Sequence, residues 1–244
     1  MNSESIKYSD GDVDLTGVFV SGSGRAEKSP GILVVHGGAG LDEHAKRQAA
    51  RFAKLGYVAF ACDMYGDGVA GDRQRVMTRI LELRNDTAKL CRRASAGLDR
   101  LRAHPLVDGR IAAVGYCFGG MTTLELARSG ADLNGVASIH GTLQTSHPAQ
   151  EHSVKTKILV CHGALDPHVP MSQVSDFVAE MNNARADWQL VIYGGAMHGF
   201  THQDGPYLPG VAYDAVSDDR SAKAIQGFLS EVFGAAISNE SAES

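Results

Sequence analysis

The sequence predicts an α/β fold in which helices cover both faces of a mostly parallel central sheet. Short apolar runs alternate with amphipathic helical stretches along most of the chain, and this alternation is typical of parallel strands joined by helical crossovers. Hydrophobic residues make up 43% of the 244 residues and charged residues 21%, which excludes a largely disordered chain. No shift in composition marks a boundary, so we expect a single domain over 1–244, with a core from about residue 12 to about residue 234 and a frayed tail at 235–244.

The order of the expected elements begins with a strand at 13–20, paired antiparallel at the edge of the sheet. Further strands are predicted at the apolar runs 31–35, 57–62, 110–115, 136–140, 157–162 and 189–193. Helices are predicted from the spacing of apolar residues at 43–55, 73–84, 86–103, 118–128, 171–182 and 218–233. In such sheets the chemistry lies in the loops that follow the carboxyl ends of the strands.

Charge and composition exclude several classes of function. Lys and Arg number 23 against 28 Asp and Glu, for a net charge of −5, so the chain lacks the basic surface that nucleic-acid binding needs. No apolar stretch reaches the length of a membrane span of about 18 residues, and the polar first ten residues do not form a secretory signal. We expect a cytoplasmic monomer or homodimer, with Cys62, Cys91, Cys117 and Cys161 as free thiols.

The most informative loop is Gly115-Tyr-Cys117-Phe-Gly119, between a predicted strand and a predicted helix. A nucleophile at the centre of such a turn is pushed out at the sheet edge, and the flanking positions must be glycine because they crowd each other. The N-terminus of the following helix favours a thiolate. We therefore expect Cys117 to be a nucleophile; the alternative is a buried structural cysteine.

A thiolate nucleophile needs a base, and the base needs an orienting acid. Asp166 and His198 follow the last two predicted strands, which gives the order nucleophile, acid, histidine that α/β-hydrolases show. His168 is a rival base, although it lies too near Asp166 in sequence for the usual geometry. A zinc site is a further alternative, built from His162, Asp166, His168, His198 and His202. It leaves the Gly-Cys-Gly turn without a role, so we expect no metal and no cofactor.

An oxyanion hole is expected beside Cys117. The backbone N–H of Phe118 supplies one donor, and the loop His36-Gly37-Gly38 supplies the other, with Gly38 preferred over Gly37. The alternative for this loop is a plain turn from strand to helix.

Taken together, these motifs give the chain a resemblance to the dienelactone hydrolases (carboxymethylenebutenolidases), α/β-hydrolases that use Cys in place of Ser. The motifs are GYCFGG around Cys117, HGALDPHVP around Asp166, AMHGF around His198 and GYVAFACDMYGDG at 56–68. The resemblance extends over about 13–233. It implies a triad of Cys117, His198 and Asp166 that hydrolyses an ester, lactone or thioester bond of a small molecule.

Three positions depart from the family pattern. Gly37 stands where the family carries a glutamate, Arg79 where it carries a tyrosine, and His202 where it carries a second substrate-binding arginine. Arg75 resembles the first of these arginines. Arg75 and Arg79 offer bidentate recognition of a substrate carboxylate, or else they belong to a solvated helix face.

We expect Arg75, Arg79, His202, Gly37 and Tyr65 to contact the substrate, which is an ester or lactone with or without a carboxylate. Two other functions fit the residues. One is a hydrolase-fold protein that binds a ligand without turnover, and the other is a thiol-redox protein that uses Cys117.

Overall fold

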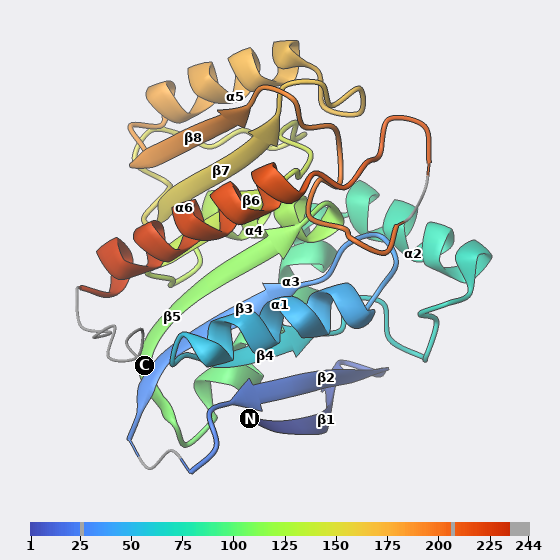
Figure 1. Cartoon of the computed structure of the whole chain (residues 1–244), viewed down its shortest axis with the longest axis vertical. Helices are drawn as coiled ribbons and strands as arrows, with labels where there is room; N and C mark the ends of the chain where they lie inside the picture. Colours follow the sequence, from blue (N-terminus) through green and yellow to red (C-terminus); the bar gives the residue numbers. More distant parts are fainter. Residues whose placement is uncertain (25–26, 206–207, 235–244) are drawn as a thin grey trace.

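A mixed β-sheet runs through the centre of the computed structural model, which describes residues 1–24, 27–205 and 208–234 (Figure 1). The predicted frayed tail at 235–244 lies outside these residues. The strands are β1 (Asn2–Asp10), β2 (Val13–Ser21), β3 (Ser29–Val35), β4 (Val58–Cys62), β5 (Val107–Tyr116), β6 (Gly135–Ile139), β7 (Lys157–Gly163) and β8 (Trp188–Tyr193). The helices are α1 (Glu43–Lys54), α2 (Arg73–Asn85), α3 (Thr87–Arg102), α4 (Phe118–Arg128), α5 (Met171–Asn183) and α6 (Ala215–Phe233).

The strand order among the described residues is β1-β2-β4-β3-β5-β6-β7-β8. Every pair from β4 through β8 is parallel, whereas β2 pairs antiparallel with both β1 and β4. The predicted fold class is therefore confirmed. The parallel strands have their carboxyl ends at the same end of the sheet, so the loops that follow β3, β5, β6, β7 and β8 meet there.

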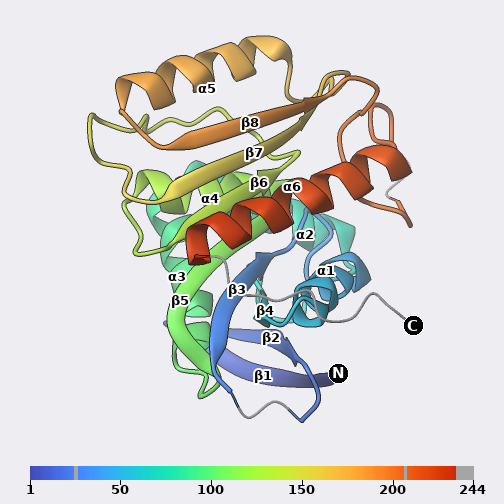
Figure 2. The ribbon, with the colours of Figure 1, turned by 60° about the vertical axis from the view of Figure 1, so that its left-hand side comes forward.

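Each central strand is buried on both faces, as a strand of a parallel sheet with helices on both sides must be. In β3, Leu33 and Val35 face one apolar layer, while Ile32 and Val34 face the other. The first layer lies under α3, α4 and α5, and the second lies under α1 and α6. Figure 2 shows α1 and α6 on the same side of the sheet.

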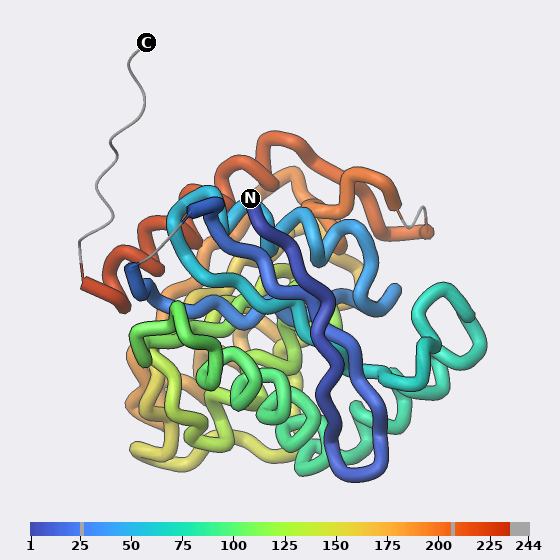
Figure 3. The backbone as a smooth tube through the Cα atoms, turned by 90° about the horizontal axis from the view of Figure 1, so that it is seen from below, coloured from blue at the N-terminus to red at the C-terminus, as the bar shows by residue number. Residues whose placement is uncertain are grey.

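The sheet edge at the N-terminus differs from the prediction. The predicted edge strand is β2, but β1 lies outside it, paired along its whole length from Asn2 opposite Ser21 to Asp10 opposite Val13. The hairpin closes at Gly11, whose φ of 59° suits glycine, and its two strands run side by side in Figure 3. The prediction was wrong here because β1 is polar and mostly exposed, so backbone pairing rather than apolar burial fixes it.

Helix boundaries follow their caps. The α6 helix begins at Ala215, three residues before the predicted start, because the side chain of Asp214 accepts a hydrogen bond from the backbone N–H of Ser217 at 2.7 Å. Asp72 caps α2 in the same way through Arg75 N–H at 3.1 Å. Among the described residues, none of the helices has the length and apolar character to cross a bilayer.

Candidate active site

A strained turn joins β5 to α4, with Cys117 at its centre. Cys117 has φ 54° and ψ −111°, a conformation that costs energy and is held only where the surroundings enforce it. A Cβ on Gly115 would overlap the carbonyl oxygen of Gly119, and a Cβ on Gly119 would overlap the carbonyl oxygen of Val35. Glycine at both positions therefore lets the turn pack directly against the end of β3.

The side chains of Cys117, His198 and Asp166 form one hydrogen-bonded chain. Nε2 of His198 lies 3.1 Å from Sγ of Cys117, and Nδ1 lies 2.8 Å from Oδ2 of Asp166. The other carboxylate oxygen, Oδ1, accepts the backbone N–H groups of His168 at 2.8 Å and Val169 at 3.1 Å. Both oxygens of the carboxylate are therefore held, and the imidazole is oriented at both nitrogens.

The surroundings favour a thiolate paired with an imidazolium. Burial opposes ionisation of Cys117, but the hydrogen bond and charge of His198, with the backbone N–H groups of Phe118 and Gly38, bring the pKa of the thiol below 9.0. Burial likewise opposes the charged form of His198, yet hydrogen bonds to Asp166 and Cys117 raise its pKa. The pKa of Asp166 is lowered, against its burial, mainly by His198.

The backbone N–H of Phe118, the first residue of α4, and that of Gly38, in the loop after β3, both lower the pKa of the Cys117 thiol. The loop that carries Gly38 is held by two buried side chains. His36 donates from Nδ1 to the carbonyl of Gly37 at 2.7 Å and accepts from Met64 N–H at 3.1 Å, and the Tyr65 hydroxyl donates to the Gly38 carbonyl at 3.2 Å. Two backbone N–H donors beside the nucleophile are the elements of an oxyanion hole.

Behind the turn lies a buried polar network that the sequence-based interpretation missed. Nδ1 of His140 accepts the backbone N–H of Cys117 at 3.1 Å, and its Nε2 lies 2.9 Å from the hydroxyl of Thr201. That hydroxyl lies 3.1 Å from Nε2 of His44. Burial lowers the pKa of both histidines, so the network is uncharged. His140 is the last residue of the predicted strand 136–140, and nothing in the sequence pairs it with Thr201 or His44.

A cavity of about 510 Å³ opens onto Cys117 and His198. The loop residues Gly38 and His202 line its inner part, and Leu208 and Val211 line a second side. The remaining wall is one face of α2, formed by Arg73, Val76, Met77 and Ile80. An apolar cavity with a few convergent polar groups is the usual form of a small-molecule site.

The predicted substrate-binding residues do not all reach this cavity. Arg75 and Arg79 are not among its lining residues: Arg79 forms ion pairs with Asp67 at 2.7 Å and Glu82 at 2.9 Å, and Arg75 donates to the backbone carbonyl of Asp67. The reason is helical phase, since positions 75 and 79 lie on a different side of α2 from 76, 77 and 80. In place of substrate contact, these arginines bind α2 to the preceding loop.

Of the other predicted contacts, His202 lines the cavity as expected, whereas Tyr65 and Gly37 do not line it. Tyr65 is 1% exposed and supports the Gly38 loop from behind rather than lining the cavity. His202 lines the cavity, but its pKa is lowered to about 4, chiefly by burial, so it is neutral at pH 7. Gly37 lies against it, because a Cβ there would come within 3.3 Å of the His202 ring.

The structure shows where the residues of the rival base and of the alternative zinc site lie. His168 stacks edge-on against His198, and its Nε2 lies 3.3 Å from the Pro209 carbonyl rather than bonding to Cys117. His162 is buried, and neither of its ring nitrogens has a hydrogen-bond partner. Within residues 1–24, 27–205 and 208–234, no group of three or more His, Cys, Asp or Glu side chains is placed to hold a metal ion.

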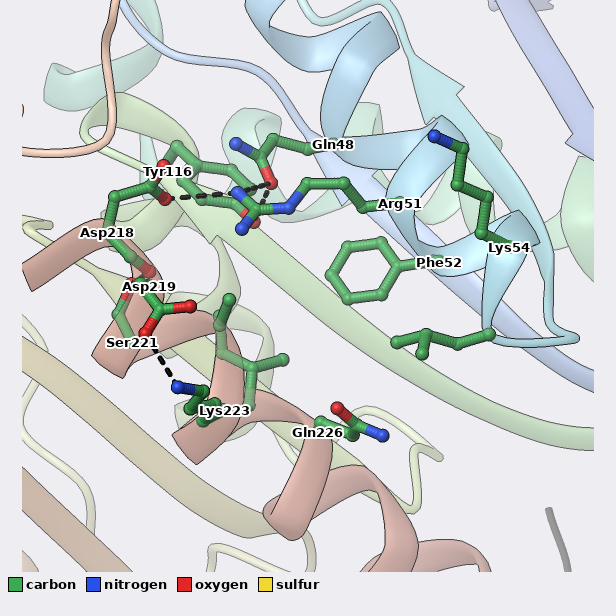
Figure 4. Close-up of a pocket in the computed structure, with 13 residues that line it drawn as sticks. Gln48, Arg51, Phe52, Lys54, Tyr116, Asp218, Asp219, Ser221, Lys223 and Gln226 are labelled. Carbon is green, nitrogen blue, oxygen red and sulfur yellow. Dashed lines mark hydrogen bonds and ion pairs between the residues drawn. The ribbon is translucent and has the colours of Figure 1, made fainter. Parts of the chain in front are cut away.

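A second cavity, of about 330 Å³, lies between α1 and α6 (Figure 4). It contains none of the triad residues. Arg51 forms an ion pair with Asp218 across it at 3.0 Å, and the Tyr116 hydroxyl donates to Gln48 at 3.0 Å. Several of its polar groups are thus paired with one another.

Comparison with known proteins places this geometry in a family. The dienelactone hydrolase family matches residues 16–233. The "Uncharacterized protein K02A2.1" of Caenorhabditis elegans is 37% identical over 150 residues, which are 59% of this chain and 95% of that protein. A provisionally assigned carboxymethylenebutenolidase of Salmonella typhimurium is 26% identical over 213 residues, 82% of this chain and 76% of that protein.

Among solved structures, a dienelactone hydrolase-like promiscuous phosphotriesterase, P91, from metagenomic libraries superposes with a TM-score of 0.89. It is 38% identical, and the match covers 96% of this chain and 99% of that one. The chain therefore belongs to the dienelactone hydrolase family and is a hydrolase of ester or lactone bonds with the α/β-hydrolase fold.

Proposed function

We propose that this protein hydrolyses a small ester, lactone or thioester through a covalent acyl-enzyme on Cys117. The observation that carries the proposal is the unbroken chain from Cys117 through His198 to Asp166, which opens into the 510 Å³ cavity. The two backbone N–H groups aimed at the sulfur are an independent support. This arrangement provides a nucleophile, a base, an orienting acid and an oxyanion hole.

In the first step the thiolate of Cys117 attacks the substrate carbonyl carbon, and the carbonyl oxygen becomes an oxyanion. The N–H groups of Phe118 and Gly38 hold that oxyanion, and in comparable hydrolases such a donor contributes about 3 kcal/mol. The imidazolium of His198 then gives its proton to the leaving alkoxide as the carbon–oxygen bond breaks. The products of this step are the free alcohol and a thioester on Cys117.

In the second step neutral His198 takes a proton from water, and the resulting hydroxide attacks the thioester carbon. Collapse of the oxyanion breaks the carbon–sulfur bond and releases the carboxylic acid. Cys117 leaves as a thiolate beside the imidazolium, so the resting ion pair is restored. Asp166 holds His198 in the tautomer that both steps need.

The direct test is turnover of 4-nitrophenyl acetate by the wild type and by Cys117→Ala. We expect a burst of 4-nitrophenol equal to the enzyme concentration, an acetyl mass increment on Cys117, and neither in the variant. Turnover that survives in Cys117→Ala contradicts the nucleophile. Tight binding of a carboxylate with no turnover would instead favour a binding protein, and peroxide-sensitive Cys117 without acylation would favour a thiol-redox protein.

Phosphotriester hydrolysis is a second candidate, favoured by the 38% identity to the promiscuous phosphotriesterase. The thiolate would attack phosphorus and expel the aryl oxide, and water activated by His198 would cleave the sulfur–phosphorus bond. Diethyl 4-nitrophenyl phosphate tests it. Release of 4-nitrophenol beyond one equivalent, absent in Cys117→Ala, is the expected result, and a single equivalent followed by inactivation contradicts turnover.

Three expectations from the sequence stay predictions: one domain, a monomer or homodimer, and a cytoplasmic location. Cys62, Cys91, Cys117 and Cys161 are free thiols in the structure. Light scattering after size-exclusion chromatography measures the oligomeric state, and thiol titration of the freshly isolated protein measures the redox state.

A further inference from the structure

The wall of the active-site cavity formed by α2 carries a helical pattern of apolar residues. Val76, Met77 and Ile80 line the cavity, and they lie on one side of the helix by their spacing. Ile80 lies close to Gly38, because its Cδ1 would be 3.7 Å from a Cβ placed on that glycine. An apolar side chain thus lies beside one of the two proposed oxyanion donors.

Two arginines of α2 that could hold a substrate carboxylate, Arg75 and Arg79, are directed away from the cavity. Arg79 is bound by two carboxylates, Asp67 and Glu82, and Arg75 donates to a backbone carbonyl on the same outer side of α2. The charge of an arginine that already forms ion pairs with two carboxylates is largely neutralised, so it binds a third carboxylate weakly. Arg73 lines the cavity, but it is exposed at the first turn of α2, where water screens its charge.

Besides His198, the imidazoles of His168 and His202 line the cavity, and Nε2 of His168 lies 3.3 Å from the Pro209 carbonyl. His202 lines the cavity as a neutral imidazole, since burial and the nearby His198 keep its pKa at about 4. Its ring is stacked on His44, with centroids 3.8 Å apart, so it is fixed in place. The reacting thiolate is itself negative, and a substrate carboxylate placed near it in a poorly hydrated site would be repelled.

We infer that this active site selects electrically neutral esters, whose apolar acyl chain packs on the face of α2 formed by Val76, Met77 and Ile80. The inference rests on the proposed acyl-transfer function and adds the substrate class. Burying an unpaired carboxylate against this face carries a large desolvation penalty, whereas an alkyl chain gains about 0.8 kcal/mol for each CH₂ it buries. Ile80 is the residue that determines specificity.

The test compares two substrates of matched length, 4-nitrophenyl pentanoate and mono-4-nitrophenyl glutarate, with Cys117→Ala as the background. We expect kcat/KM for the neutral ester to exceed that for the anionic ester by at least about tenfold. Ile80→Arg places a cation at a half-buried position of the cavity face and should lower this ratio by about tenfold, whereas Met77→Arg, at an exposed position that water screens, should lower it less. Met77 is 48% exposed, so its substitution leaves folding intact.

The matched control is Thr78→Arg, which adds the same charge to an exposed position of α2 outside the cavity; the ratio should not change. Arg79→Gln, outside the cavity, should also leave it unchanged. Preference for the glutarate ester in the wild type, or selective loss of that ester in Arg73→Gln or Arg79→Gln, overturns the inference while the acyl-transfer proposal stands. Absence of turnover with both esters contradicts the acyl-transfer proposal itself.

Discussion

His140 accepts the backbone N–H of Cys117 on Nδ1, so a buried and uncharged imidazole holds the strained residue from behind. The same N–H also reaches the carbonyl of Ile139 at 2.9 Å. On its far side His140 is oriented by Thr201, which in turn bonds to His44. His140 is thus a positioning residue, because it acts on the reaction through the placement of Cys117.

Replacement of His140 by Leu should lower kcat about tenfold without a matching rise in KM, because it removes one of the two acceptors that position the Cys117 N–H and leaves the Ile139 carbonyl alone. His140→Asn is the control, since its Oδ1 can accept the same N–H and Asn tolerates the positive φ of 41° at this position. Steady-state kinetics on one neutral ester measures both. Equal losses in the Leu and Asn variants would show a role in packing alone.

The ionisation of Cys117 should be visible in its rate of alkylation by iodoacetamide. Because folding lowers the thiol pKa below 9.0, the rate should stay high as the pH falls beneath that value, and decline only below the shifted pKa. His198→Gln removes the main stabilising partner, so the inflection should move upward. An unchanged inflection in this variant would contradict the ion pair. Mass spectrometry of the alkylated peptide distinguishes Cys117 from Cys91.

Gly119→Ala should destabilise the protein by about 3 kcal/mol, the cost of forcing a methyl group into close-packed backbone. The added Cβ would overlap the carbonyl oxygen of Val35 at the end of β3. Gly227→Ala is the matched control, because its Cβ meets nothing within 4 Å and the residue lies inside α6. That variant should be about 0.5 kcal/mol more stable than the wild type. Urea denaturation followed by circular dichroism measures both, and a neutral Gly119→Ala would contradict the tight turn.

The buried pair of Asp10 and Arg93 should stabilise the N-terminal hairpin in a pH-dependent way. Their atoms lie 2.8 Å apart and both side chains are nearly inaccessible. Although burial opposes it, hydrogen bonds from Arg93 and Arg92 lower the pKa of Asp10. A carboxyl group with a lowered folded pKa stabilises fully above its unfolded pKa of about 3.9, and this contribution is lost as the pH falls through the folded value.

Asp10→Asn should therefore lower the free energy of unfolding by about 3 kcal/mol at pH 7, with the difference shrinking below about pH 4. Asp99→Asn is the control, because Asp99 and Arg102 form an exposed pair worth about 0.5 kcal/mol. Urea titrations at several pH values measure the difference. A difference that persists undiminished at pH 3 would show that charge is not its cause.

The sequence was sufficient for the parallel part of the sheet, because each buried strand is an uninterrupted apolar run and each helix has its own apolar face. It failed at β1, whose polar residues are fixed by pairing with β2. The start of α6 was also missed, although Asp214 three residues before Ser217 is a recognisable cap. Backbone pairing and local caps are weaker signals than hydrophobic pattern.

At the candidate site, the positions of Cys117, Asp166 and His198 could be inferred from order and loop placement alone. The substrate wall could not, because the prediction for Arg75 and Arg79 relied on a family motif and ignored helical phase. The apolar positions Val76, Ile80 and Leu83 already indicate which side of α2 faces inward. The His140 network joins the loop after β6, the loop that carries Thr201 and helix α1, which carries His44, so only coordinates bring it together.

The phase of α2 has one more consequence. A helix advances by about 100° per residue, so one residue inserted into the glycine-rich loop at 66–71 would swing Arg75 and Arg79 toward the cavity and turn Ile80 away from Gly38. A change in the length of a surface loop would then switch the preferred substrate charge, although every residue of the pocket is retained. A change in loop length ahead of α2 is therefore a second way, besides a point substitution such as Ile80→Arg, to alter which substrate charge the pocket accepts.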